Sequence, residues 1–169
     1  MDLNQARILI AQMQACFKEI GVPFVNESEI LNQANCTDTI MFRSWQSKND
    51  HLAEIVTSLF IEPNVVEVSI NYREEIDRLN ESDLEKLFHL LNAFNNWDAA
   101  FYWLLLPRDN KLKFRWANLL PARHFSDNQF KSVLKRFLNQ GPQHYSYIRR
   151  LIYNNEDPDR LFSKMQAEY

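Results

Sequence analysis

Residues 98–120 have the sequence DAAFYWLLLPRDNKLKFRWANLL, and this stretch decides the fold class. Two apolar runs, 98–106 and 111–120, flank the turn-forming pair Asp109 and Asn110. The second run alternates basic with large apolar residues: Lys111, Leu112, Lys113, Phe114, Arg115 and Trp116. Alternation with a period of two is typical of a strand that has one face on the core and one face in solvent. The stretch therefore predicts a β-hairpin whose second strand is basic outside and apolar inside.

The first strand of this hairpin is apolar on both faces. Phe101, Trp103 and Leu105 alternate along it with Tyr102, Leu104 and Leu106. Because a large exposed apolar patch usually marks an interface, the second face needs a cover. We expect that cover to be another subunit, a segment of a client protein or the C-terminal helices of the same chain. The predicted partner-binding residues are Tyr102, Leu104 and Leu106 at the centre and Lys111, Lys113 and Arg115 at the rim.

Upstream of the hairpin, the pattern predicts one helix, three strands and a second helix. Residues 2–20 have apolar side chains at helical spacing, with a capping box at Asp2 and Gln5 and a stop at Gly21. Strand-like runs follow at about 38–46, 52–61 and 65–72, although 52–61 also fits a helix. The run 65–72 alternates as a half-solvated strand does. A helix over 82–96 opens with a second capping box, at Ser82 and Glu85.

Downstream of the hairpin, only helices are expected. A helix opens at Ser126 and ends at Gly141 and Pro142, a second spans about 143–153, and a short one opens at Asp157. We predict an α+β fold: an antiparallel five-stranded sheet with helices packed on one face, in the order α-βββ-α-ββ-α-α. The 169 residues are expected to form a single domain, with a core over 1–140 and a C-terminal helical extension over 141–169.

This order resembles the type III secretion chaperone-like fold. In particular, 65–138 resembles the YbjN family and related bacterial families of unknown function, including cyanobacterial ones. The resemblance rests on LLNAFN at 90–95, AFYW at 100–103, LKFR at 112–115 and FSDNQF at 125–130. It implies a non-enzymatic role, binding a protein segment and often forming a homodimer, and it implies no catalytic residues. In a homodimer, Glu67, Ser69 and Asn71 would face the basic strand of a second copy.

Composition removes several classes of chemistry. With Gly21 and Gly141 as the only glycines, the chain has no P-loop, dinucleotide fingerprint or G-x-S-x-G elbow. The chain has two cysteines, Cys16 and Cys36, and four histidines: His51, His89, His124 and His144. Their spacing does not match that of a zinc site. We therefore expect no metal, no cofactor and no enzymatic activity, while a site assembled from residues distant in sequence stays open.

Charge is distributed unevenly along the chain. Residues 1–100 hold 7 Lys/Arg and 16 Asp/Glu, whereas residues 101–169 hold 12 and 6. Ten cations lie within 108–150: Arg108, Lys111, Lys113, Arg115, Arg123, Lys131, Lys135, Arg136, Arg149 and Arg150. Interleaved aromatics make nucleic-acid binding an alternative, although the sequence pI of about 5.8 is far below that of typical nucleic-acid-binding domains.

The expected function is therefore that of a protein-binding adaptor or chaperone-like protein, acting on a protein partner or on itself. A nucleic-acid-binding regulator that uses residues 108–150 is the alternative. The first residues lack the charge and apolar pattern of a signal peptide, and no apolar run reaches the length of a membrane span. The cytoplasm is the expected compartment, without membrane association.

Overall fold

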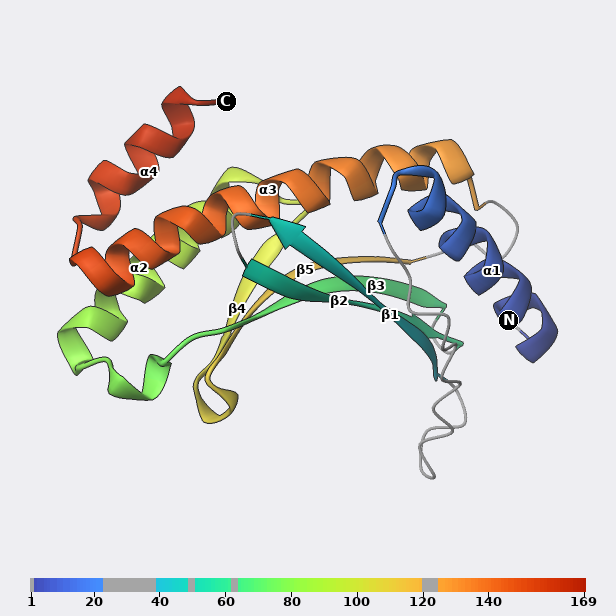
Figure 1. Cartoon of the computed structure of the whole chain (residues 1–169), viewed down its shortest axis with the longest axis horizontal. Helices are drawn as coiled ribbons and strands as arrows, with labels where there is room; N and C mark the ends of the chain where they lie inside the picture. The colour runs from blue at the N-terminus through green and yellow to red at the C-terminus, as the bar shows by residue number, and fades with distance from the viewer. Residues whose placement is uncertain (1, 23–38, 49–50, 62–63, 120–124) are drawn as a thin grey trace. The chain divides into compact units, whose positions relative to one another are not determined.

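The computed structural model describes residues 2–22, 39–48, 51–61, 64–119 and 125–169. The element order, with bounds, is α1 (Leu3–Glu19), β1 (Thr39–Lys48), β2 (His51–Phe60), β3 (Val65–Arg73), the 3-10 turn η1 (Ile76–Arg78), α2 (Glu81–Trp97), β4 (Tyr102–Leu106), the 3-10 turn η2 (Pro107–Asp109), β5 (Lys111–Leu119), α3 (Asp127–Asn154) and α4 (Pro158–Ala167). The α+β class is confirmed (Figure 1). Residues 52–61 form a strand rather than a helix.

The strands are hydrogen-bonded in the order β1-β2-β3-β5-β4. β1 pairs antiparallel with β2, β2 with β3, and β4 with β5. Asn110, between η2 and β5, has a φ of 50°, a left-handed conformation that asparagine adopts more readily than most residues. The predicted hairpin is therefore confirmed, although its first strand begins at Tyr102 rather than at residue 98. β4 lies at one end of the strand order.

Two compact units share these elements. Unit 1 comprises Met1–Asn71 and Trp116–Arg136, and unit 2 comprises Tyr72–Arg115 and Phe137–Tyr169. β3, β5 and α3 each contribute residues to both units. The chain passes between the units at 71–72, 115–116 and 136–137. The single domain and its division at residue 140 stay predictions.

Unit 1 joins α1 to the first part of α3 and has its own apolar core. Asp2 and Gln5 form the predicted capping box of α1. The Phe17 ring lies 6.3 Å from the Phe130 ring, centroid to centroid, and Lys131 pairs with Glu19 at 2.7 Å. The fully buried residues of β2 and β3 in this core include Ile55, Leu59, Val66 and Ile70.

Unit 2 has an aromatic core. The Phe114 ring of β5 stacks on the Phe137 ring of α3 at 4.8 Å and 10°. Phe101 contacts the same two rings, at 5.7 and 5.5 Å. Since each large ring buries much apolar area, this cluster joins the hairpin to α3 within unit 2.

Three local predictions were wrong. α2 begins at Glu81 under an Asn80 cap, which accepts the Asp83 amide at 2.9 Å, rather than under Ser82. Asparagine caps helices as well as serine does, so Asn80 can serve as the N-cap and the helix begins one residue earlier than predicted. β3 is not half-solvated throughout: Glu67 is 7% and Ser69 2% exposed. Alternation along a strand separates its two faces but does not show whether the polar face is covered, so the sequence could not reveal this burial.

The third correction concerns α3, which is one helix that continues through Gly141 and Pro142 (Figure 1). Proline inside a helix removes one backbone hydrogen bond, here to the Leu138 carbonyl, and its ring crowds that carbonyl. Leu138 before the proline and Tyr145 and Ile148 after it are all buried. The burial of apolar side chains before and after Pro142 therefore outweighs the free-energy cost of placing a proline inside the helix.

Replacing Pro142 with alanine should raise the free energy of unfolding by about 1–3 kcal/mol, because alanine restores the amide donor and removes the ring clash. Urea denaturation of the Pro142→Ala variant measures the change. Equal or lower stability than the parent chain would show that the packing of α3 requires the proline.

Candidate protein-binding site on the β4–β5 hairpin

The six predicted partner-binding residues lie on one face of the hairpin. The register pairs Tyr102 with Arg115, Leu104 with Lys113, and Leu106 with Lys111. Directly paired residues of antiparallel strands point to the same side of the sheet. Each of these three residue pairs therefore places one apolar side chain beside one cation. Figure 1 shows the path of the hairpin in yellow.

The two faces of the hairpin differ in burial. Trp103, Leu112 and Phe114 are 3%, 0% and 1% exposed, and Leu105 at the end of the same face is half-buried. All six residues of the other face are half-buried. α3 contacts the buried face, since Phe137 and His144 both contact Phe114. Tyr102, Leu104 and Leu106 thus keep part of their surface open on the side away from those contacts.

The cations of this face also interact within the chain. The Arg115 guanidinium carbon lies 5.4 Å from the centre of the Tyr102 ring, within the range of a cation–π contact. Lys113 and Arg115 both take part in further interactions. The apolar side chains, rather than unpaired charge, are therefore the feature of this face that a partner can bury.

The outer edge of β4 is partly occupied by a side chain of α2. The Trp103 amide donates to Asn95 Oδ1 at 2.6 Å, and Asn95 Nδ2 donates to the Trp103 carbonyl at 3.0 Å. Both backbone groups of Trp103 therefore point away from β5. Because such pairs alternate along antiparallel strands, the backbone groups of Leu105 point outward as well. Asn95 covers one residue of an edge that would otherwise invite pairing.

Asn95 binds the Trp103 backbone, whereas His144 and Phe114 contact the Trp103 side chain. Its indole Nε1 donates to His144 Nδ1 at 3.3 Å, and its ring lies 4.9 Å from the Phe114 ring. His144 is 1% exposed and stacks on Phe94 at 4.4 Å. Burial lowers the pKa of His144 to about 4, an effect that Asp98 opposes weakly, so the imidazole is neutral at neutral pH.

A second polar cluster in unit 2 surrounds Glu74, directly after β3. The Glu74 carboxylate accepts from the Tyr145 hydroxyl and, at 2.6 Å, from the Tyr153 hydroxyl, and Arg149 Nε lies 3.6 Å away. Burial, followed by the bond to Glu74, raises the pKa of Tyr145. In the sequence Glu74 lies among other acidic residues, Glu75 and Asp77, and nothing in its spacing indicates partners 71 and 79 residues away.

The cations of 108–150 divide between the two units. Lys131 in unit 1 pairs with Glu19 at 2.7 Å. Arg150 in unit 2 donates to Glu156 from Nε at 2.8 Å and from Nη2 at 2.6 Å. Arg123 lies outside the described residues. Several of these charges are therefore balanced within the chain, and this arrangement gives no support to nucleic-acid binding.

Two of the residues that the sequence assigned to the contact with a second copy are buried in unit 1. Glu67 is 7% and Ser69 2% exposed, and Asn71 donates to Glu54 at 3.3 Å. The predicted charge pairing between copies through these residues was therefore wrong. Self-association through other surfaces stays a prediction.

The histidines do not combine into a metal site in the described part of the chain. His89 contacts Asp159 at 2.7 Å, and His144 accepts a hydrogen bond from the Trp103 indole. His124 lies outside the described residues. No group of three or more His, Cys, Asp or Glu able to hold a metal ion occurs among the residues that the structure describes.

Within the described ranges, none of the helices combines the length and the apolar character that crossing a membrane requires.

Comparison with known proteins gives the fold. No protein-family model matches the sequence, and no curated protein matches it. Among solved structures, a chain in the crystal structure of the ExsC–ExsE complex is similar, with a TM-score of 0.55 and 16% sequence identity. The similarity covers 88% of this chain and 96% of the other. It supports the secretion-chaperone-like fold, and membership of the YbjN family stays a prediction.

Replacing Asn95 with alanine should lower the free energy of unfolding by about 1–3 kcal/mol, because both backbone groups of Trp103 lose their partner. Asn96, its exposed neighbour on α2, provides the control: Asn96→Ala should change stability by less than about 0.5 kcal/mol. Urea denaturation compares the two variants. Equal stabilities would show that the Asn95 bonds do not hold the edge strand.

Stability should fall in acid because His144 resists protonation only in the folded chain. The unfolded imidazole takes up a proton as pH drops below its ordinary value of 6.5, whereas the folded one does so near 4. This group therefore stabilises the fold fully above pH 6.5 and loses up to about 3 kcal/mol as pH falls to 4. Denaturation across this range should show a smaller loss in His144→Gln, and equal losses would contradict the assignment.

Proposed function

We propose that this chain is a non-enzymatic, chaperone-like protein that binds a segment of another protein on the β4–β5 hairpin face. The observation that carries the proposal is a row of half-buried apolar side chains on the edge strand β4, formed by Tyr102, Leu104 and Leu106. Burial of this row against a partner would remove apolar surface from water, which is the main favourable term in most protein association.

The fold supports this proposal. The similar chain comes from a structure named as a complex of two proteins, ExsC and ExsE. The absence of glycine-rich and nucleophile motifs in the sequence argues for binding rather than catalysis. We also propose the cytoplasm as the compartment.

The geometry favours a partner that offers apolar side chains in an extended segment. Leu104 and Leu106 are two residues apart on one strand, so their side chains match the two-residue repeat of an extended partner. The Leu105 backbone groups, which point outward beyond the residue that Asn95 covers, provide the adjacent hydrogen-bonding edge.

The test is affinity purification of the tagged chain from lysate of its source organism, with and without nuclease, beside two variants. Leu104→Glu with Leu106→Glu places charges on the face, opposite Lys113 and Lys111, which can pair with them. Ile8→Glu changes a side chain of α1 that is 62% exposed and lies in unit 1. Circular dichroism establishes that both variants are folded.

A stoichiometric protein partner should survive nuclease, bind Ile8→Glu as it binds the parent, and bind the double variant at least about tenfold more weakly. Size-exclusion chromatography with light scattering tests the chain itself as the partner. Equal recovery with both variants would contradict the assigned face. Recovery of nucleic acid, with proteins lost after nuclease, would replace this proposal with the nucleic-acid alternative.

A further inference from the structure

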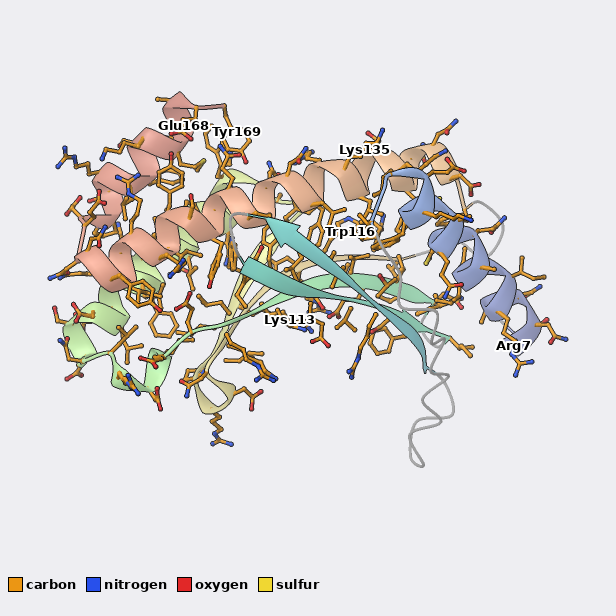
Figure 2. The ribbon with its side chains drawn as sticks, in the orientation of Figure 1. Arg7, Lys113, Trp116, Lys135, Glu168 and Tyr169 are labelled. Carbon is orange, nitrogen blue, oxygen red and sulfur yellow. The ribbon has the colours of Figure 1, made fainter. Side chains whose placement is uncertain are left out.

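His144 occupies a central position in the core of unit 2. Its ring stacks on Phe94 of α2 at 4.4 Å and meets the Phe114 ring of β5 edge-on at 6.0 Å. Its two nitrogens have different partners: Nδ1 lies 3.3 Å from Trp103 Nε1, and Nε2 lies 3.5 Å from the Tyr169 hydroxyl. Figure 2 shows Tyr169 beside Glu168 at the C-terminal end of α4.

The indole fixes the protonation state of the imidazole. An indole nitrogen can only donate, so His144 Nδ1 must accept and the ring proton lies on Nε2. A second proton would have to bind Nδ1, where it would face the Trp103 N–H. Two donors cannot share this contact, and the protonated ring and the indole must therefore separate.

The surroundings offer a protonated ring little compensation. β4 and β5 present the neutral rings of Trp103 and Phe114, α2 presents Phe94, and the chain beyond α4 presents the Tyr169 hydroxyl. Asp98, which caps the end of α2, is the charged group whose field favours protonation, and it acts against a larger desolvation cost. Separation from Trp103 is therefore the available response to acid.

Movement of the Trp103 indole would disturb the strand whose opposite face carries the partner-binding residues. Trp103 lies between Tyr102 and Leu104 in sequence, and the three side chains alternate across one short strand. The Trp103 backbone stays bonded to Asn95 while the ring contacts Tyr72 at 5.7 Å and Phe114 at 4.9 Å. Loss of the ring's polar anchor would weaken the packing that keeps β4 flat against the core.

We propose that His144 is an acid-responsive lock on β4: protonation of its imidazole displaces the Trp103 indole and loosens the strand that carries the partner-binding face. The release of a partner in acid rests on the proposed function, whereas the movement of Trp103 does not. The low pKa of His144 keeps the lock closed at neutral pH.

Nuclear magnetic resonance of the isolated chain tests the lock without a partner. The Trp103 Nε1–H resonance, assigned by its loss in Trp103→Phe, and the His144 ring nitrogens are followed from pH 7 to pH 4. Circular dichroism at each pH establishes that the chain stays folded. His144→Gln, which can accept from the indole but does not titrate in this range, provides the control.

The lock predicts that the Trp103 and His144 signals of the parent chain titrate with one midpoint below pH 6.5, and that the Trp103 signal of His144→Gln does not. In Trp103→Phe the opposing donor is gone, so the His144 midpoint should rise by about one pH unit. An unchanged midpoint in that variant, or a Trp103 signal that ignores His144 protonation, would overturn the lock. A lysate experiment that finds no partner would leave this result unaffected.

Discussion

Trp103 is the residue on which the candidate site depends, because it is held from three directions at once. Asn95 of α2 binds its backbone, His144 of α3 accepts from its indole, and Phe114 of β5 packs against its ring. A five-residue terminal strand has few ladder bonds of its own, so these side-chain contacts supply much of its order. With β4 fixed in this way, Tyr102, Leu104 and Leu106 form a defined surface rather than a mobile one.

Buried polar groups give unit 2 a specific arrangement that its apolar contacts alone would not. Glu74 gathers two tyrosine hydroxyls and approaches Arg149, and Tyr145 in turn stacks on Tyr72 at 3.9 Å. Such groups are costly to bury unless they are paired, so a displaced helix would leave them unsatisfied. The same reasoning applies to His144, whose neutral form suits its surroundings and whose charged form does not. The core of unit 2 is therefore well ordered while His144 is neutral, and protonation of His144 in acid is expected to lower its stability.

The similarity to a chain of the ExsC–ExsE complex shows the fold, whereas the binding function that we propose rests on the hairpin geometry. The first compares the path of the backbone over most of the chain at 16% identity. The second rests on which side chains of one hairpin are covered and which are not. Binding through an apolar row needs apolar character at alternate positions of a strand rather than a fixed set of reactive groups.

The sequence by itself determined the α+β class, the hairpin with its basic and apolar faces, and the six residues that share one face, because strand alternation and turn chemistry are local. It misplaced the cap of α2 and broke α3 at Pro142, since equivalent caps compete and since burial of Leu138, Tyr145 and Ile148 outweighs a local penalty. Only the tertiary structure decided that Asn95 closes part of the β4 edge, that His144 accepts from Trp103 and that Glu74 holds two tyrosines. His144 and Glu74 join their partners across 41 and 71 or more residues, and the geometry of such contacts exists only once the chain has folded.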